Sequence, residues 1–477
     1  MSAPTLGRFA DALGSTDLAR RHGRVRDLIG LVVEASGLEA EVGEVCLVQS
    51  SRARDAVPAE VVGFRAGRTL LMPLGELGGV GPGTRVTATG EPFRVQTGPH
   101  LLGRVLDGLG RPIDGGPALE PGGEWRRSVA SPPDAMERPR ITRRVSLGVR
   151  ALDALVPCGE GQRLGIFAGS GVGKSSTLGM IARATSAEVN VIALVGERGR
   201  EVREFIERDL GDAIERSVVV VATSDQPALV RIAAAFAATT IAESFRDGGA
   251  DVLLMMDSVT RFAMAQREVG LAIGEPPATR GYTPSVFALL PKLLERSGTS
   301  PAGSITGLYT VLVDGDDMNE PVADAVRSIL DGHVVLTREL AHRSHYPAID
   351  VLQSVSRLVD ELVTPEIRDA GRDVRGLLAA YQAKEDLISI GAYEPGTDPE
   401  TDRAIALRPA IEAFLRQRPD ELSTAEEADD GLLGLAAALL PEPAAPAEGH
   451  AGVAEVPAPG LGGGPGPSAL PPLHFAE

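Results

Sequence analysis

The chain has 477 residues, of which 43% are hydrophobic, 23% charged and 4% aromatic. A chain of this length predicts roughly two to four domains with ample hydrophobic core. The net charge of −18 argues against a protein whose main task is to grip nucleic acid. Much of this charge lies at the C-terminal end, because residues 420–477 contain ten acidic residues and no Lys or Arg.

Cysteine content and hydropathy predict the cellular compartment of the protein. Cys46 and Cys158 lie far apart in apolar sequence, which favours buried, unreactive thiols over a disulfide or a metal site. The N-terminus lacks a charged-then-apolar signal, and no apolar run approaches about 18 residues. These features predict a soluble, cytosolic protein.

The N-terminal quarter contains two different patterns. Residues 1–24 carry a few apolar side chains at loosely helical spacing, which fits a docking arm for a partner slightly better than a fraying terminus. Residues 25–96 contain short β runs broken by Gly and Pro, which predicts a small antiparallel β-barrel domain. The runs are 28–33, 44–48, 59–63 and 85–88. Few aromatic residues are available for base stacking, so we expect a structural or ring-collar role for this barrel.

Residues 97–359 alternate between strand-like and helical runs, the pattern of an α/β domain with a parallel sheet and helices on both faces. The strand candidates are almost continuously apolar: 189–195, 217–222, 251–256 and 305–312. The stretch 229–238 fits a helix that covers such a sheet. Residues 360–440 predict a charged helical domain, and residues 441–477 are rich in Pro, Ala and Gly, which predicts disorder.

A glycine-rich segment between a short apolar strand (162–167) and a helical run (176–183) has the setting of a phosphate-binding loop. Its backbone N–H groups can point at anionic oxygens beside the helix N-terminus. Lys174 would supply charge to the β- and γ-phosphates, and the Ser175 hydroxyl a ligand for Mg²⁺. The segment consists of Ala168, Gly169, Ser170, Gly171, Val172, Gly173, Lys174 and Ser175. Ala168 replaces the usual first glycine, which is tolerable if its φ is ordinary and negative.

Acidic residues at strand ends complete a hydrolytic site. Asp257 ends the apolar run 252–257, and in phosphate-loop enzymes an acid at such a position orients Mg²⁺. Glu197 follows the strand 189–195 and is the candidate to polarise the attacking water, with Arg198 as a phosphate contact. Phosphoryl transfer also gains from a cation near the γ-phosphate, and spacing alone does not choose between Arg261 and Arg357.

Several motifs in order resemble a known family. Residues 101–114, 148–157, 161–163 and 346–357 resemble segments of the catalytic-head subunits of rotary ATP synthases. Within that superfamily the chain is most similar to the ATPases of type III protein export, flagellar or injectisome. The stretches that carry this resemblance are 274–287, 314–321, 388–393 and the phosphate loop with its leading Ala168. The resemblance covers roughly residues 25–415 and implies a RecA-like phosphate-loop ATPase core.

The resemblance also implies roles by position. Lys174 and Ser175 would hold phosphate and Mg²⁺, Glu197 would be the catalytic base, and Arg198 and Arg261 would contact phosphate. Arg357 would be an arginine finger that reaches a neighbouring subunit, and Tyr346 would stack on adenine. Because one chain carries the whole set, the resemblance favours a homohexamer with a site at every interface.

The implied partners are a central stalk gripped by a pore loop at about 275–285, a stator or regulator, and export substrates with chaperones. The implied place is the cytoplasm, at the inner face of the cell membrane beside the export gate, with no nucleic acid. The flagellar system is favoured over the injectisome because no host-directed feature is present. Alternatives left open are a head subunit of an ion-pumping rotary ATPase, a hexameric nucleic-acid translocase, and a non-catalytic nucleotide-binding regulator.

Overall fold

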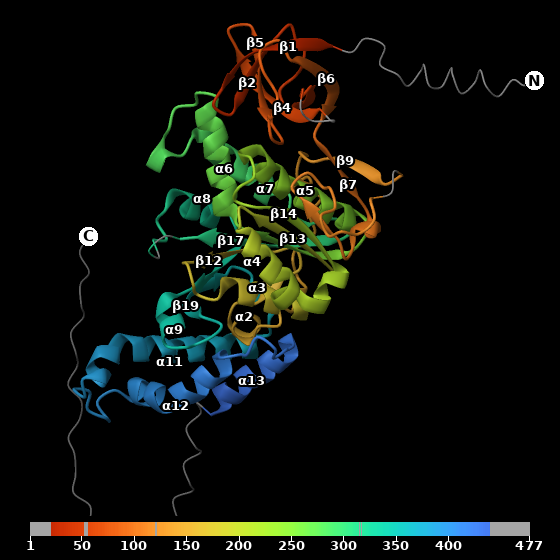
Figure 1. Ribbon diagram of the computed structural model, residues 1–477. Helices are drawn as coiled ribbons and strands as arrows, with labels where there is room; N and C mark the ends of the chain where they lie inside the picture. The colour runs from red at the N-terminus through yellow and green to blue at the C-terminus, as the bar shows by residue number, and fades with distance from the viewer. Residues whose placement is uncertain (1–20, 52–55, 120–121, 314, 316, 439–477) are drawn as a thin grey trace, which may run out of the picture. The chain divides into compact units, whose positions relative to one another are not determined.

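The computed structural model describes residues 21–51, 56–119, 122–313, 315 and 317–438. The docking arm predicted at 1–24 lies almost entirely outside these residues, and the tail predicted at 441–477 lies wholly outside them. The described chain forms a closed β-barrel, a central sheet covered by helices, and a C-terminal group of helices (Figure 1). This architecture confirms the predicted fold class.

The barrel closes in the strand order β1-β2-β5-β4-β3-β6. Its strands are β1 (His22–Ile29), β2 (Val32–Ser36), β3 (Glu44–Val48), β4 (Val57–Arg65), β5 (Arg68–Pro73) and β6 (Arg85–Pro92). Alternate side chains such as Val33, Ala35 and Leu71 fill its core. The run 28–33 is not the single strand that the sequence predicted. Gly30, with φ 59°, turns the chain there, so the run supplies the end of β1 and the start of β2.

The central sheet has nine strands in the order β19-β18-β12-β17-β15-β13-β14-β8, with β16 paired to β17. All pairings are parallel except β18 with β19 and β16 with β17. The strands are β8 (Val105–Asp107), β12 (Arg163–Ala168), β13 (Val189–Val195), β14 (Ser217–Ala222), β15 (Asp251–Asp257), β16 (Gly298–Thr299), β17 (Ser304–Leu312), β18 (Gly332–Leu336) and β19 (Ile349–Ser356). Small two-stranded pairs join β7 (Arg94–Thr97) to β9 (Glu124–Arg127) and β10 (Arg144–Val145) to β11 (Cys158–Gly159).

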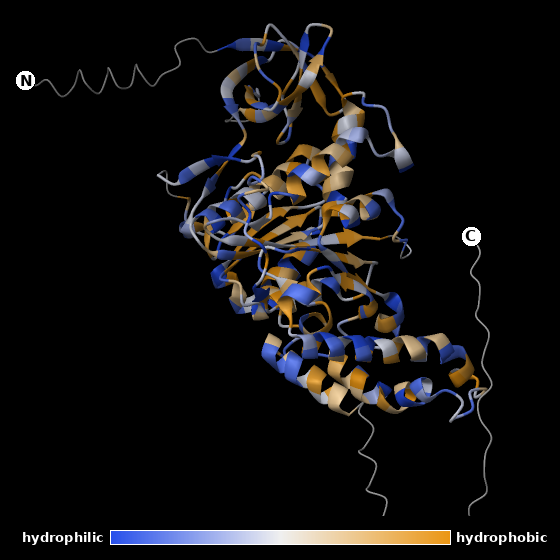
Figure 2. Cartoon of the chain, turned by 180° about the vertical axis from the view of Figure 1, so that it is seen from behind, coloured by the Kyte–Doolittle hydropathy of each residue, from blue (hydrophilic) through white to orange (hydrophobic). Residues whose placement is uncertain are grey.

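Two hydrophobic cores lie on opposite faces of this sheet. In β13, Val191, Ala193 and Val195 belong to one core, and Ile192 and Leu194 belong to the other. This alternation explains the continuously apolar strands, because a strand covered on both faces has no exposed side. Figure 2 shows the resulting apolar interior. Helices of the first core are α5 (Ala228–Asp247), α6 (Val259–Ala272), α7 (Pro284–Leu294) and α8 (Pro321–Ile329).

The second core is covered by α2 (Arg150–Leu155), α3 (Lys174–Ala184) and the C-terminal helices α11 (Pro365–Ser389), α12 (Pro399–Leu415) and α13 (Ala425–Ala437). A capping box between Thr424 and Glu427 begins α13. Arg144 of β10 forms an ion pair with Asp429 of α13, with 2.7 Å between the charged atoms. The remaining short elements are η1 (Pro99–Leu101), α4 (Gly199–Glu204), the π-helix η2 (Phe205–Leu210), η3 (Gly211–Arg216), η4 (Thr279–Gly281), α9 (Arg338–His342) and α10 (Val359–Leu362).

The structure tests the expectations for the two cysteines and for apolar runs of membrane-spanning length. Cys46 and Cys158 are buried and free, as predicted, and burial raises the pKa of the Cys46 thiol to about 12. The expectation that no apolar run approaches membrane-spanning length was wrong for α5. This helix has 20 residues and is long and apolar enough to cross a membrane, but 89% of its apolar 18-residue window is buried inside the protein. Its apolar surface is explained by its place in the core.

Candidate functional site

The phosphate loop connects β12 to α3, which is the strand–loop–helix setting that the sequence predicts. Gly171 and Gly173 have φ values of 81° and 85°, a left-handed conformation that a residue with a side chain rarely adopts. Ala168 belongs to β12 itself, and its carbonyl accepts a hydrogen bond from Val313 N–H at 3.1 Å. The alanine is therefore tolerated because its position is a regular strand end.

Three predicted side chains meet directly beside this loop. The Lys174 ammonium forms an ion pair with the Asp257 carboxylate, and its Nζ lies 3.5 Å from Oε1 of Glu197. Burial alone would lower the pKa of Lys174, but the two carboxylates raise it above its ordinary value. Burial and the neighbouring Asp257 charge raise the pKa of Glu197 to about 7. The cluster is a cation held between two carboxylates in a largely desolvated position.

The strand order explains this convergence. Lys174 follows β12, Glu197 follows β13, and Asp257 ends β15, so all three leave the sheet at the carboxyl ends of parallel strands. Strand β17 lies between β12 and β15, and β13 is the next neighbour of β15. Ligand sites of open parallel sheets form at this edge.

Thr310, a residue that sequence reasoning missed, belongs to the same cluster. It lies on β17 with no exposed surface, and its hydroxyl donates a hydrogen bond to Oδ1 of Asp257 at 2.7 Å. In the sequence, Thr310 is a threonine inside the apolar run 305–312. Threonine is an ordinary strand residue, so its presence there does not by itself indicate a role in a site. Only the insertion of β17 beside β15 gives this hydroxyl a role.

The two arginines predicted near the phosphates differ in their surroundings. The stem of Arg261 packs over Gly196, where an added Cβ would lie 2.7 Å from the arginine Cβ. Arg261 Nε is buried and has no hydrogen-bond partner among the described residues, which leaves a donor for an anion. Arg198 instead is exposed and pairs with Glu201 at 2.9 Å. The structure thus brings Arg261 under the loop after β13 and turns Arg198 to the surface.

Tyr346 lies beside the phosphate loop, whereas Arg357 lies away from it. A Cβ added to Gly173 would lie 3.4 Å from two ring atoms of Tyr346, so this aromatic ring lies beside the phosphate loop. Arg357 follows β19 at an exposed position, and its N–H donates to the Asp331 carbonyl at 3.0 Å. Within the described chain the Arg357 side chain makes no ion pair, and the structure does not bring it to the Lys174 cluster.

Oxygen donors for a metal are available in the cluster. Ser175 is exposed at the start of α3, and Asp257 carries a buried carboxylate. The described residues contain no group of three or more His, Cys, Asp or Glu side chains placed to hold a metal by themselves. Mg²⁺ in nucleotide sites is held by one or two protein oxygens together with phosphates and water, so this donor set fits it.

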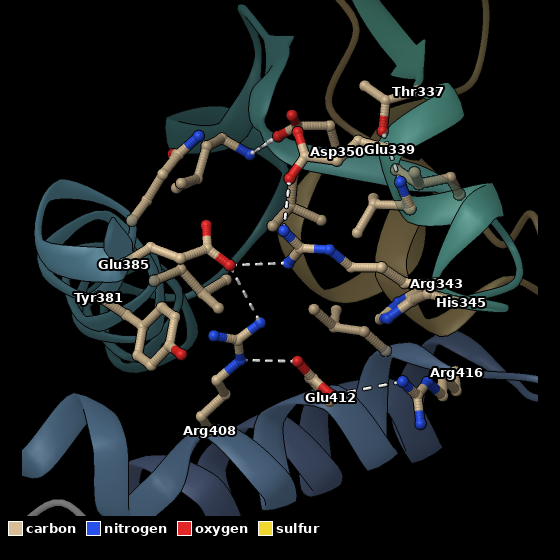
Figure 3. Close-up of a pocket in the computed structure, with 17 residues that line it drawn as sticks. Thr337, Glu339, Arg343, His345, Asp350, Tyr381, Glu385, Arg408, Glu412 and Arg416 are labelled. Atoms are coloured by element: carbon tan, nitrogen blue, oxygen red, sulfur yellow. Dashed lines mark hydrogen bonds and ion pairs between the residues drawn. The ribbon is translucent and has the colours of Figure 1, made fainter. Parts of the chain in front are cut away.

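A separate pocket has no residue of the phosphate loop in its lining. Apolar and charged side chains from β19, α9, α11, α12 and the segments beside them line it (Figure 3). Arg343 pairs with Glu385 at 2.9 Å, and Arg408 pairs with Glu412 at 2.7 Å. The first pair joins the end of α9 to α11, whereas the second lies within α12; Arg408 also lies 3.8 Å from Glu385 and so links α12 to α11.

The fold and the site define a phosphate-loop nucleotide-binding protein, and comparison with known proteins narrows this class. The ATP synthase alpha/beta family matches with its β-barrel domain at residues 25–90 and its nucleotide-binding domain at 148–356. The C-terminal domain model of the type III secretion system (T3SS) ATPase EscN matches at 363–433.

Relatives match over most of their length. A flagellum-specific ATP synthase of Bacillus subtilis is 54% identical and covers 89% of this chain and 97% of its own. A type 3 secretion system ATPase of Xanthomonas euvesicatoria is 51% identical and covers 87% and 94%. Among solved structures, the assembled ATPase EscN from the enteropathogenic E. coli type III secretion system has a TM-score of 0.83 at 46% identity, covering 87% of this chain and 100% of its own. The chain belongs to the family of flagellum-specific ATP synthases and type 3 secretion system ATPases, and it is a phosphate-loop ATPase.

Proposed function

We propose that the protein hydrolyses Mg²⁺-bound ATP as a homohexameric ring and thereby promotes the unfolding and delivery of substrates to a type III protein export apparatus. The observation that supports this most directly is the Lys174, Asp257 and Glu197 cluster beside the phosphate loop. The family membership and the likeness to an assembled export ATPase support the ring and the export role.

In the proposed reaction, a water molecule attacks the γ-phosphorus, the bond to the β–γ bridging oxygen breaks, and ADP and phosphate are released. The Glu197 carboxylate accepts a hydrogen bond from this water and takes its proton. Lys174 leaves the carboxylates to contact phosphate oxygens, and Arg261 offers its unpaired Nε–H to the same charge. Ser175 and Asp257 would hold Mg²⁺, which would supply charge neutralisation at the phosphates.

A ring explains the residues that lie outside the cluster. The exposed Arg357 would serve as an arginine finger for the neighbouring subunit, and Arg198 would contact phosphate once its pair with Glu201 opens. The loop residues 168–175 would enclose the phosphates, and the Tyr346 ring beside Gly173 would stack on adenine.

The proposed partners follow from relatives. EscN has been solved in complex with its central stalk EscO, a structure with a TM-score of 0.80 to this chain. In this protein the loop 275–285 is closed at its base, because both oxygens of Glu275 accept hydrogen bonds from Ser285. Its exposed tip would contact a stalk. A stator and export substrates with chaperones would complete the assembly at the cytoplasmic face of the cell membrane, most simply of a flagellar system.

The test compares two variants of the same cluster. Glu197→Gln should bind ATP with unchanged affinity and lose at least about 100-fold in turnover, because the water loses its base. Lys174→Ala should lose tight nucleotide binding in a direct titration. Full turnover by the Glu197→Gln ring, or unchanged affinity of the Lys174→Ala protein, would overturn the proposal.

A further inference from the structure

Gln417 is a buried side chain between α12 and α13 that connects two parts of the protein. It is 4% exposed. Its Oε1 accepts a hydrogen bond from Arg150 N–H at 2.9 Å, and its Nε2 donates to the carbonyls of Gly148 at 2.9 Å and Glu421 at 2.8 Å. Both polar atoms of the amide are therefore paired, and they tie the start of α2 to the C-terminal segment.

The backbone of the same residue reaches the nucleotide side. Gln417 N–H donates to the Tyr346 carbonyl at 2.9 Å. The Tyr346 ring in turn lies against Gly173 of the phosphate loop. A single residue of the C-terminal segment thus contacts the residue that forms a wall of the site.

The neighbouring loop residues have their own anchors. Arg343 pairs with Glu385 of α11 at 2.9 Å (Figure 3), and His345 N–H donates to the Leu340 carbonyl at 2.9 Å. Neither contact involves Tyr346. The main chain at Tyr346 is held from the C-terminal side by the hydrogen bond from Gln417.

We propose that Gln417 is a positioning residue that holds the Tyr346 ring where a nucleotide base stacks. The inference rests on the proposed function, because it assumes that Tyr346 contacts the base. Replacement of Gln417 by Leu leaves Arg150 N–H and Gly148 C=O without partners in a buried place. The segment around residue 417 then shifts, and the support of the Tyr346 carbonyl shifts with it.

A structural role without this link makes a different prediction. If the Gln417 side chain only connects α2 to the C-terminal helices, replacing it changes nucleotide affinity by the same factor whether or not the Tyr346 ring is present. If it acts through Tyr346, its loss has no further effect once that ring is removed. A double-mutant cycle separates the two cases.

The experiment uses the full-length proteins Gln417→Leu, Tyr346→Ala and the double variant, titrated with a fluorescent ATP analogue. We expect about fivefold weaker binding for Gln417→Leu and about tenfold for Tyr346→Ala. The double variant should bind within about twofold of Tyr346→Ala. Glu421→Gln is the matched control, since it removes the ion pair with Arg150 but keeps the carbonyl that Gln417 uses, and its affinity should be that of the wild type.

The outcomes separate the two claims. Unchanged affinity in Gln417→Leu, or equal losses in both backgrounds, overturns the role of Gln417 while leaving that of Tyr346 intact. Unchanged affinity in Tyr346→Ala overturns both, whereas nucleotide binding itself is tested by Lys174→Ala. Should Gln417→Leu fail to fold, as judged by thermal unfolding, Gln417→Glu keeps the acceptor for Arg150 N–H and is measured in the same cycle.

Discussion

The hydroxyl of Thr310 lies 2.7 Å from Oδ1 of Asp257, the oxygen that also contacts the Lys174 ammonium. One carboxylate oxygen is thus held by a neutral donor from the adjacent strand and by a cation from the phosphate loop. In the proposed reaction, in which Lys174 turns to a phosphate, the hydroxyl would keep the orientation of Asp257. This relationship predicts a supporting role for Thr310 in hydrolysis.

Thr310→Val keeps the shape of the side chain but removes the hydrogen bond. We expect kcat/KM for Mg²⁺-ATP to fall about tenfold, because the buried carboxylate loses an orienting donor. Thr310→Ser keeps the hydroxyl and should retain most of the activity. Steady-state hydrolysis measures both, and wild-type kinetics in Thr310→Val would show that the hydroxyl is dispensable.

Arg357→Ala should leave nucleotide binding largely intact and reduce hydrolysis about 10³-fold or more, as loss of an arginine finger does. The Arg357 side chain is exposed and makes no ion pair in the described chain, so folding should be unaffected. Mixed rings sharpen the test. Rings assembled from Arg357→Ala and Lys174→Ala chains should recover activity, because some interfaces then combine an intact loop with an intact finger. A loss confined to nucleotide affinity would contradict the finger assignment.

Gly179 of α3 packs directly against Asp209 of the π-helix η2. A Cβ there would lie 2.6 Å from the Asp209 carbonyl oxygen and 2.7 Å from Asp209 Cβ. Gly179→Ala should therefore lower the free energy of unfolding by about 1–3 kcal/mol, since backbone must move. Gly434→Ala is the matched control, because nothing lies within 4 Å of its added Cβ in α13. It should stabilise by about 0.5–1 kcal/mol, and denaturant unfolding distinguishes the two. Equal stability of the two variants would rule out the contact as a packing constraint.

Asp114 carries a pH-dependent part of the stability. The Arg104 guanidinium, at 2.7 Å and 2.9 Å, and the N–H groups of Val105 and Gly116 hold the pKa of the Asp114 carboxyl well below its usual range. A depressed acidic pKa stabilises the folded state above the unfolded pKa of about 4, and this stabilisation is lost as the pH falls below that value toward the folded pKa.

Asp114→Asn should therefore cost about 2 kcal/mol in free energy of unfolding at pH 7. The difference from the wild type should shrink as the pH falls from about 4 toward 2. Urea unfolding at several pH values measures it. A difference that stays constant with pH would mean that the charge of Asp114 is not what stabilises this turn.

Local patterns in the sequence carried much of the prediction. The apolar runs 189–195 and 217–222 coincide with β13 and β14, because a strand buried on both faces is almost continuously apolar, here with Asn190 and Ser217 as polar exceptions. The phosphate loop was equally readable, since its glycines and Lys174 act within a few consecutive residues. By contrast, the run 28–33 was misread as one strand, because hydropathy does not show that Gly30 reverses the chain.

The sequence by itself determined the order of elements, the loop that takes phosphate, and the acids that end β15 and follow β13. Only the tertiary structure decided which side chains meet there. The insertion of β17 between β12 and β15 brings Thr310 to Asp257, and the return of the C-terminal segment brings Gln417 to Tyr346. These contacts join residues far apart in the chain, so they depend on the strand order and helix packing of the whole domain, for which no local spacing is a signal.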